Sequence, residues 1–278
     1  MKIAELWVYP IKGCRGIALP QAIVMRTGLQ YDRQWMIVDE SGQFITQRQF
    51  PQLTQIVVTW DDQTLKLTHA VDSDNVCSIP LALEGTERAV QVWRSQTIAL
   101  DQGDEVAAWL TAVIEHSVRL VRQSPQHLRP IDPAYAKADD VPVSFADGYP
   151  ILVTNMASLD DLNTRLAQKY GDRSQCIPMN RFRPNVVVVG ELPFAEDHWS
   201  GLKTGAVDLN LVKPCDRCIV TTTDQHHGTR HPQQEPLKTL ATFRKRPRQG
   251  ILFGVNAIPQ HLGEIRVGEE VQIVEQLP

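Results

Sequence analysis

Short runs of alternating apolar and polar residues, separated by turn residues, recur along most of this chain of 278 residues. A period of two is typical of half-buried strands, because successive side chains point to opposite faces of a sheet. We expect strands at 3–8, 22–25, 34–38, 53–60, 90–93, 97–100, 118–121, 185–189, 207–212, 218–223 and 251–257, and a terminal hairpin over 265–273. Many short strands predict a mainly β fold of the β-barrel type with a few helices.

Two segments show the apolar spacing of helices instead. The first covers 104–115. The second is expected to begin at Ser158, which forms a capping-box pattern with Asp161, and to end at Gly171. Each helix is predicted to support the core with one apolar face: Val106, Trp109, Leu110 and Val113 in the first, and Leu159, Leu162 and Leu166 in the second.

Residues 123–143 are rich in proline and aspartate and lack periodicity, which is typical of a linker or a long functional loop. The length of the chain allows two domains of average size. We therefore predict one domain over 1–122 and a second over 123–278.

Charge and cysteine content exclude several classes of protein. A net charge of −4 gives no overall electrostatic footprint for nucleic acid. No apolar run is long enough to span a bilayer, and the N-terminus has the pattern of a strand rather than a signal peptide, so we expect a cytoplasmic protein. The five cysteines, an odd and sparse set, favour functional or simply buried thiols over a disulfide framework.

The strongest local signal is Lys-Pro-Cys-Asp-Arg-Cys at residues 213–218, just before an expected strand. Positive charge near a thiol favours the thiolate, and thiolates are soft ligands that suit redox metals. Three other interpretations stay open. They are a zinc site completed by His226, His227 and His231, a thioredoxin-like redox pair, and two buried inert cysteines.

Two further segments supply cations that suit an anionic ligand. Arg181 and Arg183 come just before an expected strand, where guanidinium groups can hold an anion in a bidentate way, although an exposed arginine pair is the more common explanation. Lys12 and Arg15 lie in a glycine-containing loop, whose backbone amides can approach a phosphate. Arg33, before the next strand, adds another cation.

Residues 244–248, Arg-Lys-Arg-Pro-Arg, form a basic run. Such a run is usually a solvated loop. The functional alternative is docking of an acidic electron-donor protein, because opposite charges steer the encounter of two proteins.

Taken in this order, the segments resemble a known family. Residues 9–16 (Tyr-Pro-Ile-Lys-Gly-Cys-Arg-Gly) and 31–35 (Tyr-Asp-Arg-Gln-Trp) are similar to the MOSC N-terminal β-barrel domain, which the resemblance places at 1–122. Residues 182–185, 196–199 and 215–224 are similar to the MOSC domain, a β-barrel that binds molybdenum cofactor, at 123–278. Within the family, the chain most resembles the mitochondrial amidoxime-reducing component and its bacterial counterparts.

The resemblance implies a molybdenum-pyranopterin (molybdopterin) cofactor, and because its cationic contacts come from both halves of the chain, we expect it in a cleft between them. It makes Cys218 the metal ligand and the catalytic residue, and Cys215 a neighbour that is not a ligand. Gly13 stands where the nearest relatives carry a hydroxyl. The implied cofactor-binding residues are Lys12, Gly13, Arg33, Asp147, Arg183, Asn185, Asp216, Arg217 and Cys218.

The implied activity is that of a molybdenum-dependent oxidoreductase that reduces the N–O bond of small N-hydroxylated compounds such as amidoximes and hydroxylamines. No run of cysteines could hold an iron–sulfur cluster, so a separate flavin, cytochrome or ferredoxin-type protein is expected to supply the electrons, with no nucleic acid or membrane as partner. Asp147 is a candidate proton handler. The alternative function is a non-catalytic carrier of molybdenum cofactor or sulfur, with a persulfide on Cys218.

Overall fold

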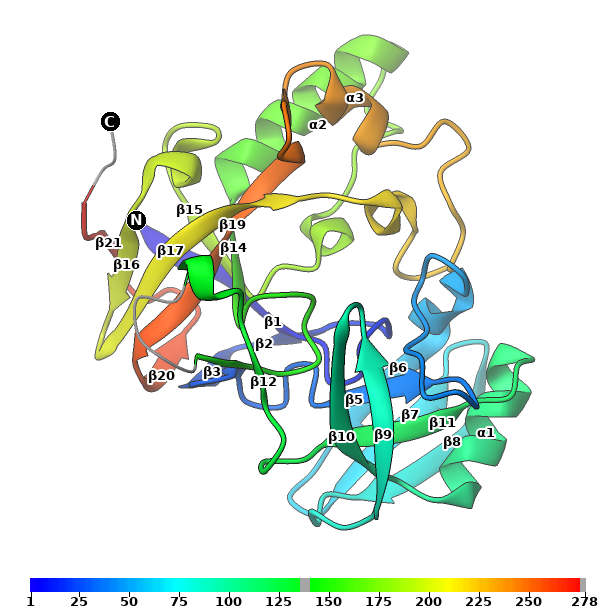
Figure 1. Cartoon of the computed structure of the whole chain (residues 1–278). Helices are drawn as coiled ribbons and strands as arrows, with labels where there is room; N and C mark the ends of the chain where they lie inside the picture. The colour runs from blue at the N-terminus through cyan, green and yellow to red at the C-terminus, as the bar shows by residue number, and fades with distance from the viewer. Residues whose placement is uncertain (136–140, 276–278) are drawn as a thin grey trace.

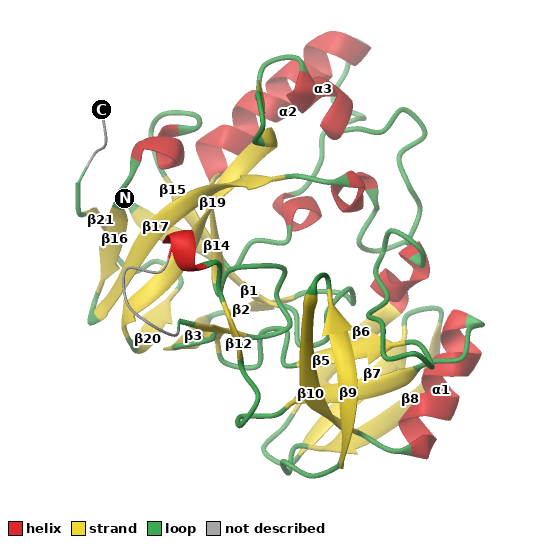
Figure 2. Ribbon diagram, in the orientation of Figure 1, coloured by secondary structure: helices red, strands yellow, loops and turns green. Residues whose placement is uncertain are grey.

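Strands dominate the computed structural model, which describes residues 1–135 and 141–275 (Figures 1 and 2). This confirms the predicted mainly β class with a few helices. The largest sheet has nine strands in the order β2-β1-β15-β14-β19-β17-β16-β21, with β18 paired to β19. Its strands are β1 (Lys2–Val8), β2 (Ile17–Leu19), β14 (Ile151–Asn155), β15 (Val186–Val189), β16 (Gly201–Thr204), β17 (Val207–Asp216), β18 (Lys245–Arg246), β19 (Gly250–His261) and β21 (Gln272–Ile273).

Smaller sheets hold the other strands of the described residues. One contains β3 (Gln21–Met25), β4 (Gly28–Leu29) and β20 (Gly263–Arg266); a second contains β5 (Trp35–Val38), β9 (Thr86–Val92), β10 (Ser95–Asp101) and β11 (Arg119–Gln123). A third contains β6 (Ile56–Trp60), β7 (Thr64–His69) and β8 (Asp72–Pro80), and β12 (Arg129–Pro130) pairs with β13 (Pro142–Val143). The helices are α1 (Asp104–Ile114), α2 (Met156–Tyr170) and α3 (Leu237–Ala241), with 3₁₀ turns η1 (Pro51–Gln55), η2 (Pro133–Tyr135), η3 (Met179–Phe182), η4 (Ala195–His198) and η5 (Ile219–Thr222).

The large sheet and the small sheet of β3, β4 and β20 each join strands from the two halves of the chain. β1 pairs antiparallel with β15, with Leu6 opposite Val186, and β3 pairs with β20. Buried Ile3 and Leu6 therefore share one apolar cluster with Val186 and Val255. The valine run of β15 is apolar without alternation because three of its four residues are buried. The first strands thus pack with the C-terminal half, and the domain boundary at 122/123 stays a prediction.

A second core lies around α1, at the lower right of Figure 1. Leu110 of α1 is buried in one apolar cluster with Leu67 of β7 and Leu120 of β11. The predicted apolar face of this helix is confirmed for Val106 and Leu110, whereas Trp109 and Val113 pack at its edge. This core supports the strands and loops that carry the N-terminal residues of the site.

Helix α2 begins two residues before the predicted start. Asn155 caps it, because its side chain accepts a hydrogen bond from the Ala157 amide at 3.1 Å. The predicted capping box at Ser158 is wrong, since that hydroxyl donates instead to the buried carboxyl of Glu196, 2.7 Å away. The end at Gly171, in a left-handed conformation with φ of 81°, is confirmed, as is the burial of Leu159, Leu162 and Leu166.

Two predicted strands and the predicted terminal hairpin differ from the structure. The strand expected at 218–223 is replaced by the 3₁₀ turn η5 at Ile219–Thr222. The hydroxyls of Thr221 and Thr222 donate to the carbonyls of Cys218 and Ile219 and so compete with strand pairing. Residues 51–55 form η1, so the next strand begins only at Ile56. The terminal hairpin is wrong: β20 pairs with β3, and β21 pairs with β16. Residues 136–140 of the predicted linker lie outside the described residues.

Candidate active site

One pocket of about 420 Å³ brings together residues from both halves of the chain. The N-terminal half supplies the loop after β1, the segment around residue 47 and the turn between β9 and β10. The C-terminal half supplies the segments before β14 and β15 and the end of β17. The pocket is lined by every cofactor residue that the sequence predicted: Lys12, Gly13, Arg33, Asp147, Arg183, Asn185, Asp216, Arg217 and Cys218.

Cations outnumber carboxylates in this pocket. Asp147 and Asp216 are the acidic residues of its lining, against six cationic side chains. The cations are Lys12, Arg33, Arg48, Arg183, Lys213 and Arg217. Such an excess of positive charge in a concave site attracts and binds an anion.

Two arginines share the ring of Tyr9. The guanidinium carbons of Arg33 and Arg183 each lie 4.1 Å from its centroid, and Arg33 Nη2 donates to the Arg183 carbonyl at 3.1 Å. Arg33 is paired with the buried Asp32 at 2.6 Å, whereas no carboxylate of the described residues forms an ion pair with Arg183. Burial, followed by repulsion from Arg33, lowers the pKa of Arg183 to about 10. An anionic ligand would offset both effects.

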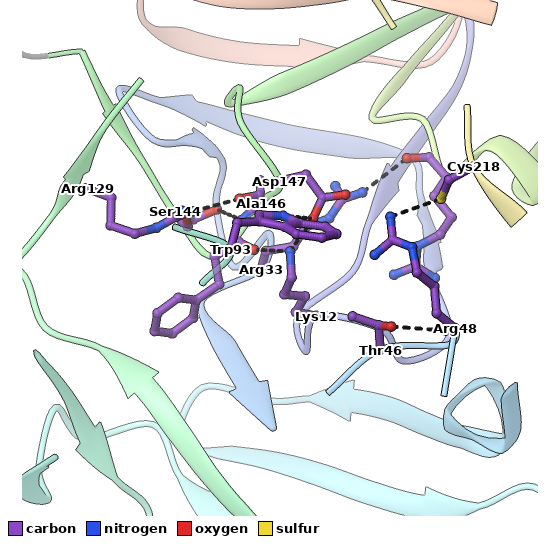
Figure 3. Close-up of polar contacts among 12 residues, drawn as sticks. Lys12, Arg33, Thr46, Arg48, Trp93, Arg129, Ser144, Ala146, Asp147 and Cys218 are labelled. Carbon is purple, nitrogen blue, oxygen red and sulfur yellow. Dashed lines mark hydrogen bonds and ion pairs between the residues drawn. The ribbon is translucent and has the colours of Figure 1, made fainter. Parts of the chain in front are cut away.

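Lys12 and Asp147 form an ion pair across the pocket, with Nζ and Oδ1 2.5 Å apart (Figure 3). Lys12 also donates to the Phe145 carbonyl, and Asp147 also accepts from the Trp93 indole at 3.1 Å. Desolvation favours the neutral acid, but Lys12, Trp93 and Arg48 outweigh it, so the pKa of Asp147 lies well below its usual range. Desolvation also lowers the pKa of Lys12, against the attraction of Asp147.

Asn185 holds Arg33 in place by hydrogen bonds. Its side-chain oxygen accepts from Arg33 Nη1 at 3.2 Å and from the Leu152 amide at 3.1 Å, and its Nδ2 donates to the Trp7 carbonyl. It therefore fixes Arg33 against β1 and β14. Gly13 has a φ of 89°, a left-handed conformation that favours glycine over residues with a Cβ.

The cysteine segment, residues 213–218, forms another wall of the pocket. β17 ends at Asp216, whose carboxylate accepts from the Ile251 amide at 2.9 Å. Arg217 Nη1 lies 2.8 Å from the sulfur of Cys215, so this flanking cation contacts the first cysteine of the pair and not the second. Both thiols are partly exposed, which excludes the interpretation of two buried inert cysteines.

Arg48 contacts the second thiol, and the sequence did not reveal it. Its Nη2 lies 3.1 Å from the sulfur of Cys218, and its guanidinium stacks 4.5 Å from the centroid of Trp93 (Figure 3). Trp93 has a φ of 56° in the turn between β9 and β10, which is rare for a bulky residue. The sequence analysis marked neither residue as part of the site: Arg48 lies in a segment without periodicity, and Trp93 was expected to end a strand at 90–93, whereas β9 ends at Val92.

The remaining predicted ligands lie elsewhere. Arg181 is buried near Asp224 at 3.7 Å, and Arg15 donates to backbone carbonyls; neither lines the pocket. His227 contacts Asp224, and His231 contacts a glutamine oxygen. Within residues 1–135 and 141–275, no three His, Cys, Asp or Glu side chains form a group that could hold a metal, so the zinc interpretation has no support.

The helices of this protein are short or carry charged and polar faces. None in the described part of the chain is both long enough and apolar enough to cross a bilayer.

Comparisons with known proteins divide the chain in the same order as the motifs. Residues 1–117 match the MOSC N-terminal beta barrel domain, and residues 140–272 match the MOSC domain. Mitochondrial amidoxime-reducing component 1 is similar to 99% of this chain, with 34% identity over 82% of the mouse protein and 33% over 83% of the human one. The molybdenum cofactor sulfurase of Danio rerio is 31% identical over 91% of this chain and 31% of its own length.

Proposed function

The chain belongs to the MOSC-domain family, and from this premise we propose that it reduces N-hydroxylated compounds with a molybdenum cofactor and electrons from a separate donor protein. Its family membership and the names of its relatives support a function linked to molybdenum cofactor. One observation carries the finer proposal: the thiol of Cys218 lines the same cation-rich pocket as Arg33 and Arg183.

The residues present fit such a cofactor. Arg33 and Arg183 would hold its phosphate, since Arg183 has no carboxylate partner among the described residues and its charge is disfavoured by burial. Cys218 would be the thiolate ligand of the metal, with Asp216 and Arg217 fixing its segment. When bound, the cofactor supplies two-electron metal chemistry that removes the oxygen of an N–O bond.

Arg48 has a positioning role in this proposal. Its hydrogen bond to the sulfur of Cys218 orients the ligand from the N-terminal half, and stacking on Trp93 restrains its guanidinium. Such contacts around a ligand fix its orientation and its basicity.

The pair of Lys12 and Asp147 is our candidate for handling protons at the reacting oxygen. The low pKa of Asp147 keeps it ionised, so the proton of the pair resides on Lys12, whose pKa is lowered. Lys12 Nζ is the atom that would donate, and Asp147 holds it toward the pocket.

Replacement of Cys218 by alanine tests the proposal. We expect wild-type protein from a cofactor-competent host to convert benzamidoxime into benzamidine with dithionite-reduced methyl viologen, and Cys218→Ala to lose at least a thousandfold in rate. Cys215→Ala is the matched control and should keep most of the activity. A Cys218→Ala protein that is folded and as active as wild type would overturn the ligand assignment.

A second candidate function is carriage of cofactor or sulfur without turnover, with a persulfide on Cys218. The similarity to a protein named molybdenum cofactor sulfurase favours it. A carrier would contain molybdenum and pterin, or cyanide-releasable sulfur, yet form no benzamidine. Metal, pterin and product analysis of one preparation therefore distinguishes the two candidates.

A further inference from the structure

A basic hairpin lies next to the cysteine segment of the pocket. It consists of β18, a turn and the first residues of β19, and its strands pair at Arg246 and Gly250 (Figure 1, orange, beside α3). Residues 245–249 are exposed and include Lys245, Arg246 and Arg248 but no carboxylate. The hairpin thus presents three positive charges on a chain whose net charge is −4.

The base of the hairpin is firmly anchored. Arg244, the first residue of the predicted basic run, is buried and pairs with Asp197 at 2.6 Å, so the prediction of a solvated run is wrong for this residue. Its Nε also donates to the Leu252 carbonyl across the hairpin. The exposed charges of residues 245–248 are therefore carried by a hairpin whose base is held in place.

The same hairpin is hydrogen-bonded to the cysteine segment. The Ile251 amide donates to the Asp216 carboxylate, and the Arg217 amide donates to the Ile251 carbonyl at 2.7 Å. A Cβ at Gly250 would lie 2.0 Å from Asp216 Oδ1, so only glycine allows this close approach. One strand, β19, separates β18 from the end of β17, which corresponds to about 10 Å across two strand spacings.

We propose that this basic hairpin, residues 245–250, is the docking surface for an acidic electron-carrier protein. The inference rests on the proposed function, because a reductase needs electrons, and no described group of cysteines or histidines could hold a second redox metal. Opposite charges would guide the carrier to the strand pair that adjoins Cys218. Nucleic acid and anionic lipid are weaker candidates, since three charges on one short hairpin provide few phosphate contacts.

Binding of the full-length chain to a plant-type [2Fe–2S] ferredoxin and to a flavodoxin, both acidic, tests the proposal. The variant is Lys245→Glu, Arg246→Glu and Arg248→Glu. The control is Lys66→Glu, Lys203→Glu and Arg266→Glu, which changes the net charge equally at exposed positions of β7, β16 and β20. Titration calorimetry at 20 and 200 mM NaCl measures affinity.

We expect at least one carrier to bind wild type more weakly at high salt. The hairpin variant should lose at least tenfold in affinity at low salt, and the control less than twofold. Equal losses in the two variants, no binding by either carrier, or hairpin-dependent binding only to phosphatidylserine vesicles or duplex DNA would overturn the proposal.

Activity assays separate this proposal from the proposed function. Methyl viologen is small and needs no docking surface, so the hairpin variant should reduce benzamidoxime with viologen at the wild-type rate and lose only carrier-supported turnover. If wild type itself fails with viologen, the proposed function fails, while the binding measurement still decides the docking surface.

Discussion

At the scale of single residues, the pocket is built from side chains held in place by unusual backbone conformations. Arg33, Trp93 and Arg183 all have positive φ, between 48° and 56°. Such conformations cost free energy in residues other than glycine and concentrate where function requires a fixed side chain. Here they direct two guanidinium groups onto Tyr9 and an indole onto Asp147.

Trp93 offers a test of this trade between stability and function. Asparagine tolerates the left-handed region, so Trp93→Asn should relieve about 1 kcal/mol of strain and offset the lost packing on Phe44. We expect the melting temperature to stay within a few degrees of wild type. The kcat/KM for benzamidoxime should fall about tenfold, because Arg48 and Asp147 each lose their contact with the Trp93 ring. Trp93→Phe, which keeps a ring, should fall less. A fully active Trp93→Asn protein would remove Trp93 from the site.

At the scale of elements, the short turn η4 and the residue after it contain the MOSC-like motif of residues 196–199, which does not line the pocket. Glu196 is buried and accepts from the Ser158 hydroxyl of α2, Asp197 pairs with Arg244 before β18, and Trp199 is buried in the core. The motif therefore joins α2, the base of the hairpin and the large sheet. Its role is structural, which the sequence pattern alone did not indicate.

Glu196 predicts a pH dependence of stability. Burial, opposed by the Ser158 hydrogen bond, raises the pKa of Glu196 to about 7 from its ordinary value of 4.5. The folded state therefore binds the proton more tightly than the unfolded state, and this contribution is complete below about pH 4.5 and lost as the pH rises to 7. We expect the free energy of unfolding of wild type to fall by about 3 kcal/mol, relative to Glu196→Gln, between pH 4.5 and 8.

Urea unfolding of the two proteins at intervals of one pH unit measures this difference. Asp160→Asn, a change at an exposed carboxylate on α2, is the control and should leave the slope with pH unchanged. Parallel curves for wild type and Glu196→Gln would show that the glutamate is ionised in the fold.

At the scale of the whole molecule, the sequence predicted local structure better than long-range contacts. Alternation located most strands, and the residues that the family resemblance implied meet in one pocket. The turn η5 was missed because threonine favours both strands and side-chain bonds to its own backbone. Arg48 was missed because its partner Cys218 is 170 residues away, and no periodicity encodes such a contact.

Two sheets that combine strands from both halves predict that the chain cannot be divided at the proposed boundary of 122/123. A fragment of residues 123–278 lacks β1 and β3, the partners of β15 and β20, and would expose the apolar cluster that includes Val186 and Ile265. We expect this fragment alone to bind the dye ANS and unfold without a cooperative transition, and to recover a cooperative transition on mixing with residues 1–122. Circular dichroism during heating gives the measurement, and independent cooperative folding of the fragment would contradict the prediction.

The joining of β1 to β15 and β19 through one sheet also has a consequence for biosynthesis. The ribosome synthesises the N-terminal half first. Lys12 and Arg33 are therefore made before the C-terminal residues that complete the pocket, which follow more than 100 residues later. The pocket is complete only after β19 has paired with β17. We therefore expect the proposed cofactor to be inserted after translation, into a chain that has already folded.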